Sequence, residues 1–141
     1  MDRIAPHEIP LAAEPASVAA ARRYFTTIAA EADLPPEVRD AGVLAVSELV
    51  TNAVLHGGAP ITLRVTTLPR TVRVAVSDGS NRPPRLRRAP TRPPSTGRRS
   101  DHHGRGLAIV ARVAEQWGCA PAVQSPGKTV WCNLTVDARL P

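Results

Sequence analysis

Three regularly spaced polar residues on a largely apolar segment are the first indication of chemistry in this sequence. Glu48, Asn52 and His56 recur every fourth residue in SELVTNAVLHGG (residues 47–58), so a helix would align them on one face. An amide oxygen such as that of Asn52 can hold Mg²⁺, which keeps waters and phosphate oxygens as its other ligands. Glu48 could act as a general base near that metal. The alternatives are an ion pair between Glu48 and an arginine, and a His56 that only marks the helix end.

Asp78 is a second candidate, because it ends an alternating stretch. Val72, Val74 and Val76 alternate with Arg, Ala and Ser, and Asp78 continues the parity of the valines. In a strand, its carboxylate would point to the face that the helices cover and would need a hydrogen-bond donor there. An aspartate that only opens a turn with Gly79 is the alternative.

Two glycines around an arginine precede a third apolar run. In GRGLAIVARVAEQWG, residues 104–118, the glycines predict a turn that opens a short helix. Glycines let a ligand approach the backbone, and the free N–H groups and dipole of a helix start attract phosphate. Glycines that only end a loop are the alternative.

The positive charge of the chain is concentrated in one segment. The formal charge is +6 over 141 residues, but residues 82–105 hold eight arginines against one aspartate, which gives +7 there and −1 elsewhere. A long segment of this kind, rich in Pro and Arg, is usually functional or disordered. With aromatics at 3%, few side chains can stack on bases, so we expect no nucleic-acid partner.

The elements that must position these residues follow from hydrophobic spacing. Helices are predicted over residues 15–32 and 37–56, and the second is apolar nearly all round, which predicts protein cover on both sides. Alternation predicts an antiparallel hairpin over residues 61–77 and a closing hairpin about SPGK, residues 125–128. Residues 1–13 form an irregular or strand-like lead-in. The order predicts an α+β fold, a two-layer α/β sandwich with helices on one face of a mainly antiparallel sheet.

Cysteine usage and hydropathy indicate the compartment. Cys119 and Cys132 are isolated from each other and from metal-ligand spacing, so we expect buried thiols in a reducing cytosol. The N-terminal stretch has no apolar region typical of a signal peptide, and no apolar run is long enough to span a bilayer. These features predict a soluble, cytoplasmic protein without a membrane partner.

In this order, the motifs resemble the GHKL ATP-binding fold, also called the Bergerat or histidine-kinase-type ATPase fold. ELVTNAVLHGG resembles its N box, VAVSDGS its G1 box, HGRGLAIVARVAEQWG its G2 box and GKTVWCNL its closing strand. The resemblance implies a lead-in over residues 1–14 and a single ATP-binding domain over residues 15–137, with an ATP lid at about residues 79–103. The ordered set is far more specific than any single motif.

Within that superfamily the chain is most similar to the small bacterial anti-sigma-factor serine kinases, the RsbW/SpoIIAB-like group. In 141 residues we expect neither the phosphoacceptor domain of a histidine kinase nor the transducer domain of the gyrase and chaperone ATPases. The resemblance implies a homodimeric serine/threonine kinase that uses ATP and Mg²⁺. Its partners would be a sigma factor or a STAS-type antagonist, and the antagonist would be phosphorylated.

The resemblance also assigns roles to individual residues. Asn52 would hold Mg²⁺, and Glu48 would be the base that activates a serine hydroxyl. Asp78 would bind the adenine amino group, with Gly79 beside it in the G1 box. Nucleotide contacts would also come from the G2 box and the lid, through Gly104, Arg105, Gly106, Leu107, Arg99 and Arg98, with Arg105 the first choice for the terminal phosphate.

The sequence departs from the family pattern in two places. The usual G1 box reads D-x-G-x-G, whereas DGSN places Gly79 directly after Asp78 and lacks a second glycine. The lid is unusually rich in Pro and Arg. These departures favour weaker nucleotide binding or a lid adapted to a partner. They motivate an alternative, a non-catalytic switch in which ATP orders the lid; a nucleic-acid-binding protein that uses the Arg-rich loop is a distant third.

Overall fold

A computed structural model describes residues 5–81, 114–121 and 126–136 of the chain. Their elements, in chain order, are β1 (Ala5–Leu11), α1 (Ala16–Glu31), α2 (Pro36–Asn52), the π-helical turn η1 (Ala53–Gly57), β2 (Ile61–Thr67), β3 (Thr71–Asp78), β4 (Ala114–Pro121) and β5 (Lys128–Thr135). Within these residues, no helix is both long and apolar enough to cross a membrane.

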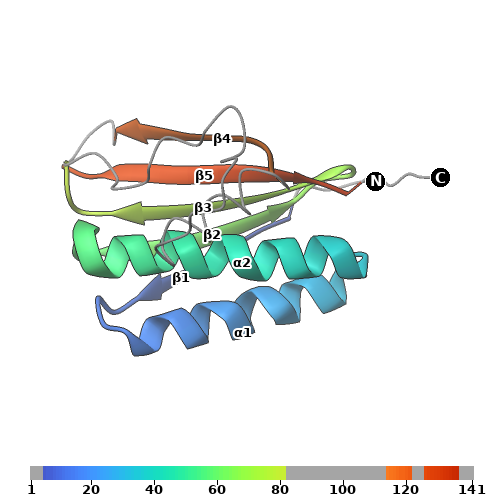
Figure 1. Cartoon of the computed structure of the whole chain (residues 1–141), viewed down its shortest axis with the longest axis horizontal. Helices are drawn as coiled ribbons and strands as arrows, with labels where there is room; N and C mark the ends of the chain where they lie inside the picture. Colours follow the sequence, from blue (N-terminus) through green and yellow to red (C-terminus); the bar gives the residue numbers. More distant parts are fainter. Residues whose placement is uncertain (1–4, 82–113, 122–125, 137–141) are drawn as a thin grey trace, which may run out of the picture.

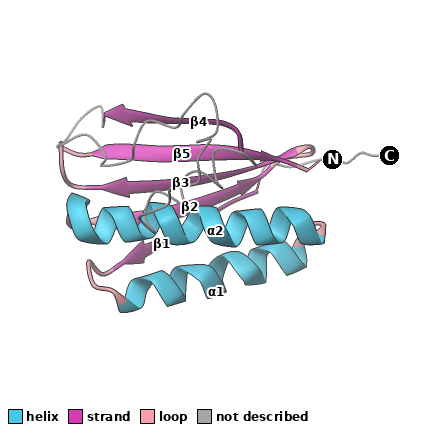
Figure 2. Ribbon diagram, viewed as in Figure 1, coloured by secondary structure: helices cyan, strands magenta, loops and turns pink. Residues whose placement is uncertain are grey.

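The strands form a five-stranded sheet in the order β1-β2-β3-β5-β4, and every neighbouring pair is antiparallel. Helices α1 and α2 lie side by side against one face of this sheet (Figures 1 and 2). The predicted α+β fold, with helices on one face of an antiparallel sheet, is therefore confirmed. Within the predicted lead-in, residues 5–11 form a strand, because β1 pairs with β2 over its whole length.

The core lies between the two layers. In β2 the residues Ile61, Leu63 and Val65 are buried, and the alternation continues in β5 and, apart from the buried Ala75, in β3. Helix α2 begins at two prolines, which suit a first turn because their missing N–H groups have no partner there in any case. Its apolar faces pack on α1 and on the sheet, but Leu55 beyond its end is 59% exposed in the described structure. The prediction of protein cover on both sides is therefore wrong at that residue.

Strand β4 corrects the predicted helix over residues 104–118. Its residues Ala114–Pro121 are extended and pair antiparallel with β5, so residues 114–118 are strand. The closing hairpin is confirmed, and its first strand begins at Ala114. The remaining part of the predicted helix, residues 104–113, lies outside the described residues.

The two cysteines differ in environment. Both are free thiols, and Cys132 is buried in β5 as expected. Cys119 is exposed on the edge strand β4, so the prediction that it is buried is wrong. An edge strand has a neighbour on one side only, which leaves its side chains less covered.

Candidate functional site

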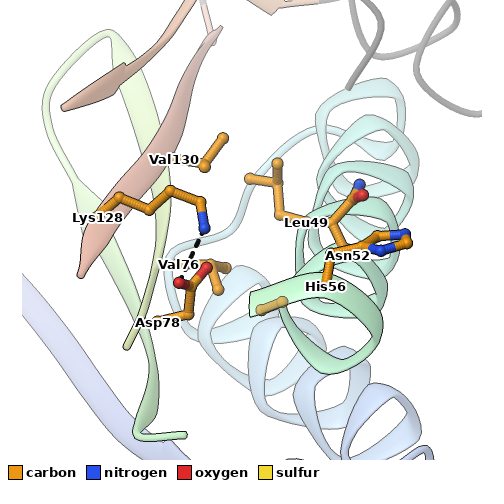
Figure 3. A pocket seen from close by; sticks show the side chains of 8 residues that line it. Leu49, Asn52, His56, Val76, Asp78, Lys128 and Val130 are labelled. Carbon is orange, nitrogen blue, oxygen red and sulfur yellow. Dashed lines mark hydrogen bonds and ion pairs between the residues drawn. The ribbon is translucent and has the colours of Figure 1, made fainter. Parts of the chain in front are cut away.

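A hollow lies where the C-terminal end of α2 and the turn η1 meet strands β3 and β5 (Figure 3). It is partly enclosed, and part of its space is open to solvent. The residues that line it are Leu49, Asn52, Ala53, His56, Val76, Asp78, Lys128 and Val130. Apolar side chains thus form much of the wall, and a few polar groups converge on it, as is typical of a small-molecule site.

Asp78 lines this hollow with a buried carboxylate. It ends β3 with the same parity as Val74 and Val76, so its side chain faces the helices, as predicted from the alternation. Its Oδ1 accepts hydrogen bonds from Lys128 Nζ at 2.9 Å and from the Ser80 backbone N–H at 2.9 Å. The expected donor partner is therefore a buried lysine.

Lys128 is a site residue that sequence reasoning missed. It begins β5, directly opposite Asp78 in the β3–β5 pairing. It continues the parity of Val130 and Cys132, which face the core, and it is the only lysine of the chain. A charged residue in a buried parity position was the signal that could have identified it.

Asn52 faces the hollow from the last turn of α2. Its Nδ2 donates to the backbone carbonyl of Glu48 at 3.0 Å, which fixes the amide. No group among the described residues donates to its Oδ1, so this oxygen remains for a ligand.

The donor set around Asn52 fits Mg²⁺ held chiefly by a ligand. No cluster of three or more His, Cys, Asp or Glu side chains in the described parts of the chain could hold a metal ion. A single amide oxygen suits an ion whose other ligands are phosphate oxygens and water. Asn52 would therefore hold the ion by one bond, as the resemblance implies.

Glu48 and His56 occupy different places around the hollow. Glu48 lies one helical turn before Asn52, is half-buried, and is not among the residues that line the hollow. His56 does line it, from the turn η1, although its side chain is exposed. The helix-end position expected for His56 is confirmed, and it also adjoins the site.

Close backbone packing holds Asp78 in place. A Cβ atom on Gly57 would collide with the Asp78 carboxylate, so the turn η1 can approach only with glycine at that position. Gly127 has a φ of +128°, and a Cβ there would collide with the Asp78 carbonyl oxygen. The Gly79 N–H donates to the Gly58 carbonyl at 3.0 Å, which ties the end of β3 to the segment after η1.

The structure thus brings together two of the predicted ligand contacts, Asn52 and Asp78, with His56 beside them. Gly79 adjoins Asp78 but does not line the hollow. The remaining predicted contacts lie outside the described residues: Gly104, Arg105, Gly106, Leu107, Arg99 and Arg98.

Comparison with known proteins agrees with this arrangement. The chain is similar to the crystal structure of the RsbU and RsbW domains of Rv1364c from Mycobacterium tuberculosis, with a TM-score of 0.64 and 22% identity. The alignment covers 96% of this chain and 33% of that one, so this chain spans about a third of its length. At this identity the likeness shows the fold alone.

No curated protein matches the chain significantly. A family model, the histidine kinase-like ATPase domain, matches residues 11–132. This range contains the hollow and most of the sheet and helices around it. The chain therefore belongs to the histidine kinase-like ATPase domain family.

Proposed function

We propose that the hollow binds ATP with Mg²⁺. The observation that carries this proposal is the convergence of Asn52 and Asp78 on one apolar-walled hollow from different elements. The carboxylate of Asp78 can accept from the adenine amino group, and the free Oδ1 of Asn52 can ligate the metal that neutralises the phosphates. The family match supports ATP as the nucleotide.

Calorimetric titration with ATP and Mg²⁺ tests the binding site. Asn52→Ala removes the metal ligand and Asp78→Asn alters the base contact, so each is expected to weaken binding at least tenfold, on the order of 1.4 kcal/mol. Matched controls are Asn133→Ala on the outer face of β5 and Asp40→Asn on the exposed side of α2, which should bind as the wild type does. Wild-type affinity in both site variants would refute the assignment.

We further propose that the protein uses the bound ATP as an anti-sigma-type serine/threonine kinase. In this role Glu48 takes the proton of a serine hydroxyl, while Asn52 positions the metal and Arg105 or Arg99 and Arg98 neutralise the terminal phosphate. Bound Mg²⁺ would supply charge neutralisation at the phosphates. The protein would transfer the phosphoryl group to a STAS-type antagonist.

Labelled ATP and the cognate antagonist test this activity. Glu48→Ala is expected to lower transfer by a factor of about 10² to 10⁴, the usual contribution of a general base, without loss of ATP binding. Glu37→Ala, in the exposed first turn of the same helix, is the control. No phosphoryl transfer by the wild type, or equal transfer by the wild type and Glu48→Ala, would refute the kinase proposal.

Two observations favour a second candidate, a non-catalytic ATP-dependent switch. Glu48 does not line the hollow in the described structure, and the G1 box has only one glycine. In this case ATP binding would order the lid and present a protein-binding surface without chemistry. ATP binding that strengthens partner binding, with no turnover on any partner, would select the switch over the kinase.

For either role we propose a sigma factor or its antagonist as the partner, and a homodimer as the assembly. The resemblance of the sequence motifs to the RsbW/SpoIIAB-like group motivates this class of partner. Sedimentation velocity would test the dimer: a single species of monomer mass at all concentrations up to 100 µM would contradict it.

A further inference from the structure

The buried ion pair between Asp78 and Lys128 is only partly satisfied by the protein. Both side chains are shielded from solvent, with exposed fractions of 4% and 7%, and Nζ lies 2.9 Å from Oδ1. An ammonium group has three N–H donors, but Lys128 uses one of them within the described structure. Among the same residues, no group donates to Oδ2 of Asp78.

Unused hydrogen-bonding capacity on a buried charge is costly unless a ligand or water completes it. Here Lys128 and Asp78 both line the hollow, so the unused donors of the ammonium group lie beside the carboxylate there. Figure 3 shows both side chains extending from the sheet toward each other, opposite Asn52 and His56 of the helix. Because the charges cancel, the pair offers a donor next to an acceptor, and little net charge.

A donor beside an acceptor is the complement of a purine edge. Adenine presents an amino donor next to the N1 acceptor, and guanine presents the O6 acceptor next to the N1–H donor. A carboxylate alone would place an acceptor opposite the guanine O6, which is also an acceptor. The two oxygens would repel each other, so guanine would bind poorly. Lys128 changes this, since lysine is an effective donor to guanine O6.

We propose that Asp78 and Lys128 together read the purine edge, and that Lys128 admits guanine nucleotides to the site alongside adenine nucleotides. This inference rests on the proposed nucleotide-binding function. The flat faces of the base would lie against the apolar wall formed by Leu49, Val76 and Val130. Asp78 accepts from the adenine amino group, and Lys128 donates to O6, which occupies the same position of the ring in guanine.

The test is titration with ATP, GTP and ITP in the presence of Mg²⁺. ITP carries the 6-oxo group of guanine without its 2-amino group, so it isolates the contact with Lys128. The wild type is expected to bind all three within about tenfold of each other. Lys128→Met keeps the approximate length of the side chain and removes the donor. Its affinity for GTP and ITP relative to ATP should fall by a factor of about 10² or more, because a hydrogen-bonding partner of O6 is lost. Lys128→Arg should retain GTP and ITP binding.

The control is Arg64→Met, which breaks the ion pair between Arg64 and Glu8. The N–O distance of this pair is 2.9 Å, the same as between Lys128 and Asp78, but its side chains are 56% and 52% exposed. This variant should leave the ratios of the three affinities unchanged. A wild type that binds ATP and excludes GTP and ITP by 100-fold or more would overturn this inference and leave the proposed function standing. Absence of binding by all three nucleotides would refute both. If Lys128→Met does not fold, the wild-type ratios and the Lys128→Arg variant decide the question.

Discussion

Asp78 and Lys128 are both buried, so neither charge can turn to bulk water when its partner is removed. Asp78→Ala leaves a buried ammonium without its counter-ion, and we expect the free energy of unfolding to fall by about 3–5 kcal/mol. The double change Asp78→Ala/Lys128→Met removes both charges and should be clearly more stable than Asp78→Ala alone. Urea unfolding followed by tryptophan fluorescence measures both.

The exposed ion pair between Arg64 and Glu8 provides the comparison. Glu8→Ala should cost less than about 1 kcal/mol, because solvent screens this pair. A double variant at Asp78 and Lys128 no more stable than the single one would contradict the account, since the cost would then come from lost packing and not from the stranded charge.

The Cys132 thiol gives the unfolding free energy a dependence on alkaline pH. Burial raises its pKa from the ordinary value of 9.0 to about 12, while the Arg73 guanidinium acts in the opposite direction. The unfolded thiol ionises first, so stability is unaffected well below pH 9 and decreases between pH 9 and about 12. From pH 8 to 10.5 this group should account for a loss of about 2 kcal/mol.

Cys132→Val has a similar volume and no ionisable group, so urea unfolding of this variant should lack that part of the decrease. Cys119→Val is the comparison: partial burial also raises the pKa of this thiol, but it lies on the exposed edge strand, so most of the wild-type decrease should persist. Equal losses in the wild type and in Cys132→Val would show that other groups cause the alkaline decrease.

For a single residue, the sequence predicts the face to which the side chain points better than it predicts the residue that the side chain contacts. Alternation fixed the face to which Asp78 points, and burial implied that it needs a donor. The partner Lys128 lies fifty residues away and meets Asp78 only because β3 pairs with β5. That pairing is a tertiary contact, which no local pattern of residues encodes.

Strand β4 shows why one element could not be predicted from spacing. The register shifts between Ala114 and Gln116, so one extra residue bulges out of the ladder. As a result Ala114 and Trp117 both lie opposite core-facing residues of β5, although they are three positions apart. Three positions is the spacing of a helix face, and Ala, Glu and Gln are good helix formers. Pairing with β5 overrides both local signals.

The two helices were predictable because their apolar spacing is long and regular, and their contact depends on one glycine. A Cβ on Gly42 of α2 would collide with the ring of Phe25 in α1, which is fully buried. Gly42→Ala gains about 1 kcal/mol of helix propensity, but overpacking costs about 1–3 kcal/mol. Because the ring has no free space, we expect a net loss of stability in thermal or urea unfolding.

The double variant Gly42→Ala/Phe25→Leu separates these effects. Leucine is smaller than phenylalanine, so the double variant should lose less stability than the two single variants lose in sum. Strict additivity of the two changes would indicate that Gly42 and Phe25 do not compete for the same space.

On the scale of the whole molecule, the hollow joins segments that are far apart in the chain. The end of α2, the end of β3 and the start of β5 each contribute lining residues. In the unfolded chain these residues are separated, so a ligand that uses all three segments binds only the folded state. Ligand binding must then raise the global stability, and not only the stability of a loop.

We therefore expect ATP with Mg²⁺ to raise the free energy of unfolding by about 2.7 kcal/mol at a free concentration of 100 times Kd, and by about 4.1 kcal/mol at 1,000 times Kd. Urea unfolding at each concentration measures the increase. Asn52→Ala, at the same absolute concentrations, should show a smaller increase, whereas Asp40→Asn on the exposed side of α2 should match the wild type. A midpoint that is insensitive to ATP while calorimetry detects binding would mean that the nucleotide binds outside the hollow, to a segment whose contacts persist on unfolding.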